Sequence, residues 1–193
     1  MVRFAAIVLT LTAAVAAADD KKAAPPAQVA ITAELACMHC TFGEGDHCAV
    51  CLKLDDKTPV LLAGKTAKQF EEDRLSGKVV VIEGTLSLNK DKRLVLTSDA
   101  GRFFTDADRN KAPAKGEVRV VGLACCGKCD LGLCDECTLA IKNAGNPIVL
   151  DGKLAAQHAE EGKEAKQATV TGKLFLDKRG LIRVEAKKVE VKK

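Results

Sequence analysis

The sequence of 193 residues contains no tryptophan and no tyrosine, and phenylalanine occurs six times. Proteins that bind single-stranded nucleic acid stack the bases on aromatic side chains along a basic groove. Carbohydrate sites also favour flat aromatic surfaces. Because the chain has so few of these side chains, we expect neither nucleic acid nor carbohydrate as a partner.

The chain also lacks a strong excess of either charge. Its 30 basic and 26 acidic residues give a formal net charge of +4, and the two kinds are interspersed. This pattern is typical of a solvated surface rather than of a phosphate-binding stripe. Paired carboxylates do not recur between the two halves, and there is no Ser/His/Asp arrangement and no phosphate-cradling glycine loop. The sequence therefore disfavours catalysis without deciding the question.

The N-terminus has the layout of a secretory signal peptide. The apolar stretch over 4–15 is shorter than the roughly 20 residues that a membrane-spanning helix needs. Arg3 precedes this stretch, and the small residues Ala16 and Ala18 follow it. We therefore expect a signal peptide over 1–18, with a retained membrane anchor as the alternative. After its removal we expect no membrane span, and a location in the periplasm or outside the cell.

The rest of the chain is an internal repeat. Val29 to Cys37 resembles Val118 to Cys126, and three cysteines recur at an offset of 89 residues. After one deletion the offset becomes 88, and Gly84 then corresponds to Gly172. The aligned cysteines are Cys37, Cys40 and Cys48 in the first copy and Cys126, Cys129 and Cys137 in the second. We expect a flexible leader over 19–27, repeats over 28–105 and 117–193, and a linker over 106–116.

Each copy predicts a strand, a cysteine loop, a strand, a short strand, a helix and two further strands. This is the element order of the OB-fold. We therefore predict a mainly β (α+β) protein of two tandem OB-like five-stranded barrels, each with one short helix; a small mixed sandwich is the alternative. The helices are expected over 66–75 and 153–161, and Thr66 and Gln69 resemble a capping box. A glycine inside the fourth strand, Gly84 or Gly172, indicates a sharp bend or a bulge.

The chain has nine cysteines, eight of which form two groups. Two C-x-x-C turns can deliver four thiolates to a zinc ion at about 2.3 Å per sulfur, and soft thiolates also suit Cu(I) or iron. The favoured prediction is one zinc-like ion in each repeat, held structurally or for delivery. Its ligands would be Cys37, Cys40, Cys48 and Cys51 in the first repeat, and Cys126, Cys129, Cys134 and Cys137 in the second.

Two other interpretations stay open. In an oxidising compartment the cysteines could form the structural disulfides of an envelope binding module, although nine is an odd number. Cys126 and Cys129 also form a C-x-x-C pair beside Lys128, as in thiol–disulfide oxidoreductases, although no thioredoxin-like order of strands and helices surrounds them. The two copies would have to take the fourth metal ligand from different places. Strand alternation points Cys51 out of the barrel, and the repeat aligns Cys51 with Ala140 rather than with a cysteine.

The sequence pattern of both cysteine loops also resembles that of a known group of proteins. Over Ala36–Phe42 and Gly122–Leu131 a strand is followed by a C-x-x-C turn and a hydrophobic residue, and a third cysteine precedes the next strand. In these features the chain resembles a group of small exported bacterial proteins of unknown function with a C-x-x-C-x₇-C motif in an OB-like barrel. The resemblance covers both repeats and implies no activity. Independently of the resemblance, the partner is unknown, and an envelope protein is the candidate class.

Overall fold

The computed structural model describes residues 26–192 of the chain. The predicted signal peptide over 1–18 lies outside the described residues, as does most of the leader expected over 19–27. Within the described range, no helix combines the length and the apolar character that crossing a membrane requires.

The first half of the chain forms a closed five-stranded barrel. The strands connect in the ring β1–β2–β3–β5–β4, and β4 pairs with β1 to close it. The helix α2 follows β3 in the chain and contacts both β3 and β5. The elements are β1 (Gln28–Cys37), α1 (Met38–Phe42), β2 (Val50–Lys53), β3 (Pro59–Gly64), α2 (Lys65–Gln69), β4 (Val79–Leu88) and β5 (Leu94–Phe103).

The second half repeats this order, which confirms the predicted fold class. Its ring runs β6–β7–β8–β10–β9, and β9 pairs with β6. A short 3-10 helix, η2, follows the helix α3. The elements are β6 (Glu117–Cys126), β7 (Leu139–Ile141), β8 (Ile148–Asp151), α3 (Lys153–Gln157), η2 (Glu161–Glu164), β9 (Gln167–Leu176) and β10 (Ile182–Val191).

Period-two alternation places the apolar side chains of each first strand inside its barrel. Val29, Ile31 and Leu35 of β1 are at most 2 % exposed and belong to the main core. Val118 and Val120 of β6 are also buried in this core. Burial of this continuous apolar face against the opposite strands supplies the main stabilisation of a small barrel.

The glycines inside β4 and β9 mark the bends that close the barrels. A Cβ at Gly84 would lie 2.3 Å from the carbonyl oxygen of Thr97, and a Cβ at Gly172 would lie 2.1 Å from that of Glu185. The pairing of β4 with β5 shifts register at Gly84, and that of β10 with β9 shifts opposite Gly172. The prediction of a bend or bulge at these positions is confirmed.

The predicted capping box on α2 is wrong. The helix begins after Gly64, and no side chain caps its N-terminus. The hydroxyl of Thr66 instead donates a hydrogen bond to the carbonyl of Ser98, and the Gln69 amide donates to Gly101 at 2.9 Å. Both side chains thus bond to the backbone of β5 instead of to the N-terminus of their own helix. The α-helical segments are also shorter than expected.

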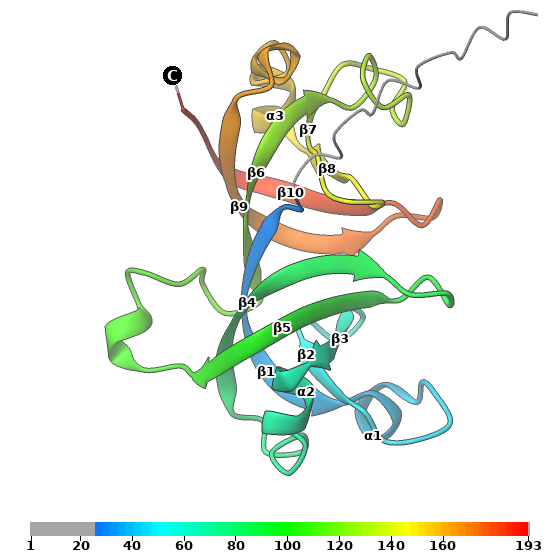
Figure 1. Ribbon diagram of the computed structural model, residues 1–193, viewed down its shortest axis with the longest axis vertical. Helices are drawn as coiled ribbons and strands as arrows, with labels where there is room; N and C mark the ends of the chain where they lie inside the picture. Colours follow the sequence, from blue (N-terminus) through cyan, green and yellow to red (C-terminus); the bar gives the residue numbers. More distant parts are fainter. Residues whose placement is uncertain (1–25, 193) are drawn as a thin grey trace, which may run out of the picture.

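The two barrels are joined edge to edge into one ten-stranded sheet. β1 pairs with β6 in antiparallel register, with Ile31 opposite Val118 and Val29 opposite Val120. Figure 1 shows the barrels one above the other along the long axis, with β1 and β6 crossing the junction. This arrangement places the two cysteine loops, which follow β1 and β6, toward opposite ends of the molecule.

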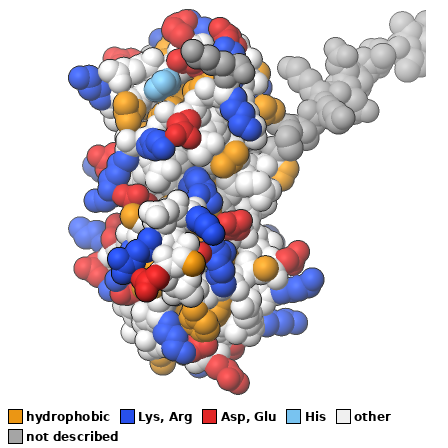
Figure 2. Space-filling model, turned by 90° about the vertical axis from the view of Figure 1, so that its left-hand side faces the viewer, with side chains coloured by type: hydrophobic (Ala, Val, Ile, Leu, Met, Phe, Trp, Pro, Cys, Tyr) orange, Lys and Arg blue, Asp and Glu red, His pale blue; other side chains and the backbone are white. Residues whose placement is uncertain are grey.

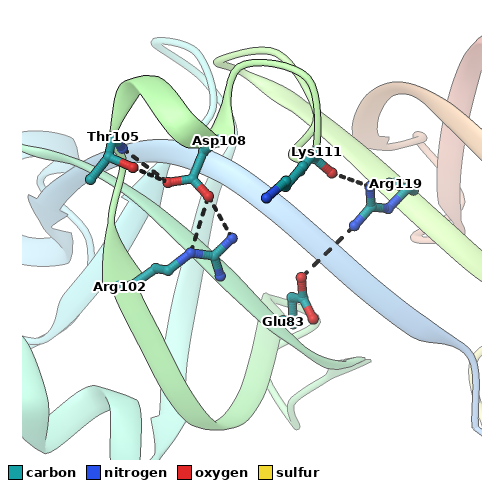
Figure 3. Close-up of polar contacts among 6 residues, drawn as sticks. All are labelled: Glu83, Arg102, Thr105, Asp108, Lys111 and Arg119. Carbon is teal, nitrogen blue, oxygen red and sulfur yellow. Dashed lines mark hydrogen bonds and ion pairs between the residues drawn. The ribbon is translucent and has the colours of Figure 1, made fainter.

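The segment between β5 and β6 is held by a polar network around the 3-10 helix η1 (Asp106–Asp108) (Figure 3). The Asp108 carboxylate accepts hydrogen bonds from the backbone and hydroxyl of Thr105, at 3.0 and 2.9 Å. It also accepts two from the guanidinium of Arg102, at 3.2 and 2.7 Å. The Asp108 side chain is 8 % exposed and that of Arg102 is 51 % exposed.

Because of this network, the protein should become less stable as the pH falls into the acid range. The hydrogen bonds from Arg102, and then those from Thr105, lower the pKa of Asp108 below its usual value of about 3.9. A depressed carboxyl pKa contributes stability above the unfolded-state pKa, and that stability is lost as the pH falls through the folded-state pKa. We therefore expect Asp108→Asn to be less stable than the parent at about pH 6 and to lose less on acidification to about pH 3.

Urea unfolding at the two pH values measures the difference. Asp106→Asn is the matched control, because Asp106 lies in the same 3-10 helix and its side chain is 90 % exposed in a surface ion pair with Arg109. Such pairs contribute little, so this variant should follow the parent at both pH values. Parallel pH profiles for Asp108→Asn and the parent would contradict the assignment.

Candidate metal centres

In the first barrel, three cysteines converge where β1 ends. Cys37 is the last residue of β1 and the N-cap of α1, and its sulfur accepts a hydrogen bond from the backbone N–H of Cys40 at 3.5 Å. The sulfurs of Cys40 and Cys48 lie 3.6 Å apart. All three sulfurs lie within 4.8 Å of one another; Cys37 is buried, whereas Cys40 and Cys48 are exposed. The helix α1 is a feature that the sequence did not predict.

The second barrel builds the same group at the end of β6. The sulfur of Cys126 accepts a hydrogen bond from the Cys129 N–H at 3.3 Å, and the sulfurs of Cys129 and Cys137 lie 3.6 Å apart. These three sulfurs also lie within 4.8 Å of one another. We call the two groups cluster 1 (Cys37, Cys40 and Cys48) and cluster 2 (Cys126, Cys129 and Cys137).

Backbone hydrogen bonds hold both cysteine loops in the same shape. The N–H of Met38 donates to the carbonyl of Ala49 at 2.9 Å, and its counterpart Gly127 donates to Thr138 at 2.9 Å. The chain then turns at a glycine in the left-handed region, Gly43 with φ 68° or Gly132 with φ 64°. A side chain is disfavoured in this conformation. Backbone hydrogen bonds and a glycine turn thus fix the conformation of each cysteine loop.

In cluster 1 the pKa values of Cys37 and Cys40 are shifted in opposite directions. Burial raises the pKa of Cys37, but the N–H groups of Cys40 and His39 and the neighbouring thiols outweigh it and bring the pKa to about 7. Hydrogen bonds to Cys48 and Cys37 raise the pKa of Cys40 to about 11. One thiol of such a cluster therefore loses its proton easily, whereas a second deprotonation is unfavourable. A metal cation bound among the sulfurs would favour that second deprotonation.

Cluster 2 follows the same electrostatic pattern. Burial alone would raise the pKa of Cys126, but the N–H groups of Cys129 and Lys128 lower it overall. Hydrogen bonds to Cys137 and Cys126 raise the pKa of Cys129 to about 11.

Cys51, predicted as a fourth ligand, lies outside the three-sulfur group of cluster 1. It points out of the barrel, as the strand alternation predicted, but α1 covers it, and it packs with Ala36 and Met38 in a small separate core. Its thiol donates to the carbonyl of Ala36 at 3.4 Å. Burial raises the pKa of Cys51 to about 12. The structure thus gives Cys51 a packing role.

Cys134, the fourth ligand predicted in the second repeat, also lies outside its three-sulfur group. Its sulfur lies beside Gly127, 3.1 Å from the position that a Cβ on that glycine would take. Burial raises the pKa of Cys134, and the charges of Arg183 and Asp151 also act on it. The ninth cysteine, Cys125, is 1 % exposed, and burial raises its pKa to about 11.

Sequence reasoning missed one residue near cluster 2, Lys163. Lys163 of η2 forms an ion pair with Glu160 at 2.7 Å. That hydrogen bond raises the pKa of Lys163 against the opposing effect of burial, and interactions with Glu160, Cys137 and Cys129 raise it further. No motif connects Lys163 to the cysteines, and only the folded barrel brings η2 against β6.

All nine cysteines lie within the described residues, and all nine are free thiols in the structure. The geometry brings together six of the eight predicted ligands in two groups of three. The remaining prediction, that Cys51 and Cys134 complete the sites, stays a prediction. Two such groups could each hold a thiophilic metal ion.

Comparisons with known proteins add a likeness in fold. No protein-family model matches the chain, and no curated protein matches it significantly. A deletion variant of the single-stranded DNA binding protein from Thermus aquaticus is similar in structure, with a TM-score of 0.47 and 18 % identity over 88 % of this chain and 95 % of that one. The wild-type form of that protein gives a TM-score of 0.46 and 17 % identity, over 89 % and 95 % of the chains.

These neighbours correct one prediction. The expectation that excluded nucleic acid as a partner class does not stand, because both of these similar structures are titled as single-stranded DNA binding proteins. The scarcity of aromatic rings argues against base stacking alone. Basic and acidic side chains are interspersed on the face shown in Figure 2. The likeness itself concerns the fold.

Proposed function

We propose that the protein is exported and that it binds two thiophilic metal ions of the zinc class, one at cluster 1 and one at cluster 2. The observation that carries the proposal is the convergence of three sulfurs within 4.8 Å of one another at the same place in both barrels. Export rests on the signal-peptide pattern over 1–18.

The spacing of the sulfurs supports a metal ion at their centre. In a tetrahedral site with zinc–sulfur bonds of about 2.3 Å, two sulfurs lie roughly 3.8 Å apart. The Cys40–Cys48 and Cys129–Cys137 distances are both 3.6 Å. This pair in each cluster is therefore within a few tenths of an ångström of the separation expected at a zinc site, and the third sulfur lies within 4.8 Å of both. Thiolate ligands favour zinc, Cu(I) or iron over calcium or magnesium.

The position of the clusters supports a site that exchanges its ion. Each cluster has one buried and two solvent-accessible thiols, of which Cys40, Cys48 and Cys129 are exposed and Cys137 is partly exposed. The barrel cores are closed independently of them. An ion bound there would be open to solvent or to an incoming ligand, which suits delivery better than a purely structural role.

Metal titration tests the proposal. Reduced, metal-free full-length chain titrated with Zn²⁺ against a chromophoric chelator should take up two equivalents, because there are two clusters. Protein with its thiols blocked by N-ethylmaleimide is the control and should take up none. Uptake of less than half an equivalent by the unblocked chain would overturn the proposal.

The same titration tests the predicted fourth ligands. If Cys51 binds the ion of cluster 1, Cys51→Ala should weaken that site by at least about 10-fold and leave cluster 2 unchanged. Cys134→Ala tests cluster 2 in the same way. Unchanged affinity in both variants would assign the fourth position to water or to a ligand from another molecule.

A further inference from the structure

Each cluster contains one pair of accessible thiols that face each other. The Cys40 and Cys48 sulfurs are 3.6 Å apart, and so are those of Cys129 and Cys137. A disulfide bond is about 2.05 Å long, so each pair must close by about 1.5 Å. Cys48 lies in the irregular segment before β2, and Cys137 lies in the corresponding segment before β7. Neither cysteine is fixed in a strand or a helix.

The third thiol of each cluster is held away from such a reaction. Cys37 and Cys126 are both fully buried, at 0 % exposure. Each is the last residue of a strand, and its sulfur accepts a hydrogen bond from the N–H three residues ahead. An oxidant in solution therefore reaches the other two thiols first, and a bond to the third would break this cap.

The cysteines outside the clusters are also poorly placed for exchange. Cys51 and Cys125 are at most 1 % exposed, and burial raises the pKa of both. Cys134 is partly exposed but lies outside both three-sulfur groups. Disulfide formation needs access to the oxidant and a second sulfur within reach, so we expect these three to remain thiols.

We infer that each cluster is also a dithiol–disulfide couple, in which Cys40 bonds to Cys48 and Cys129 bonds to Cys137. A thiolate of the pair attacks a small oxidised disulfide, such as oxidised glutathione, and expels one reduced glutathione. The second thiolate attacks the protein sulfur of this mixed disulfide and expels the other glutathione. The two protein thiols lose two electrons and two protons, and the glutathione disulfide gains them.

The couple has a consequence that rests on the proposed function. Disulfide formation removes two of the three converging sulfurs, and a single remaining thiol is too poor a site to retain a metal ion. Oxidation should therefore release the ion, and a bound ion should protect the pair. The disulfide itself requires no metal, so the two proposals can fail separately.

Mapping of the disulfides tests the inference. Metal-free full-length chain is equilibrated with glutathione buffers from fully reduced to fully oxidised, quenched with acid and alkylated with N-ethylmaleimide. We expect a loss of about 2 Da for each disulfide and, in oxidised buffer, five alkylated cysteines of the nine in the chain. Peptide mapping should link Cys40 to Cys48 and Cys129 to Cys137. Chain loaded with Zn²⁺ should oxidise at least 10-fold more slowly if the ion occupies the clusters.

Two variants separate the pairing from general thiol oxidation. Cys48→Ser should keep the disulfide of cluster 2 and leave Cys40 as a glutathione adduct. Cys134→Ser, which removes a partly exposed cysteine outside both clusters, should keep both disulfides. Nine reactive thiols in oxidised buffer, or a parent disulfide that includes Cys37 or Cys126, would overturn the inference. Equal oxidation of metal-free and Zn²⁺-treated chain, with the expected pairs formed, would instead count against metal binding.

Discussion

Serine in place of Cys37 is expected to weaken metal binding at cluster 1 by at least about 100-fold while cluster 2 keeps its affinity. The neutral hydroxyl is a poor ligand for a soft ion, and Cys37 is the buried member of the three converging sulfurs. Serine is also a favoured N-cap residue, so it can still accept the hydrogen bond that Cys37 receives from the Cys40 N–H. The loop should therefore keep its shape while the site loses its ligand.

Competition with a chromophoric chelator measures both affinities in one titration. Cys126→Ser is the mirror experiment and should remove the other site. Cys125→Ala is the matched control, because Cys125 is the neighbour of Cys126, is also buried, and lies outside both sulfur groups. Two sites of parental affinity in Cys37→Ser would show that the three-sulfur convergence is not the metal centre.

The cysteines that converge in space are those that the internal repeat had already singled out. Cys37, Cys40 and Cys48 share their spacing with the second copy, whereas Cys51 has no cysteine counterpart there. Spacing along the chain cannot show on which side of a sheet an extra cysteine is covered. Cys51 does point out of its barrel, as its strand position predicts, but the unpredicted helix α1 folds over it and makes it part of a small core. That covering is tertiary, and a local pattern does not contain it.

The order of strands in each barrel could be predicted from the sequence because it depends on local patterns. Alternation along β1 and β6 and the glycines at Gly84 and Gly172 reflect local geometry that each strand imposes on its own residues. The helix N-terminus at Gly64 was not accessible, because Thr66 gives its hydroxyl to the distant Ser98 rather than to the helix. The junction of the barrels was also out of reach, since it depends on pairing between strands far apart in the chain.

The junction carries polar contacts that bridge the two repeats. Asn143, in the segment between β7 and β8, is 6 % exposed. Its side-chain oxygen accepts from the Ala27 N–H at 3.1 Å, and its amide donates to the carbonyls of Leu86 at 2.7 Å and Asn146 at 3.0 Å. One side chain of the second barrel thus satisfies backbone groups at the entrance of β1 and in β4. Asn146 adds a contact to the N–H of Leu88 at 3.1 Å.

Asn143→Ala should therefore destabilise the whole described unit by about 2–4 kcal/mol, because it leaves the Ala27 N–H and the Leu86 carbonyl buried without a partner. Chemical denaturation followed by circular dichroism gives the free energy of unfolding, and the midpoint should shift while the slope with denaturant is kept. Asn110→Ala is the control, since Asn110 is exposed and surface substitutions usually change stability by less than about 0.5 kcal/mol. A loss below about 1 kcal/mol for Asn143→Ala would mean that water or a relaxed backbone satisfies these groups. The β1–β6 pairing would then contribute more to the junction than Asn143 does.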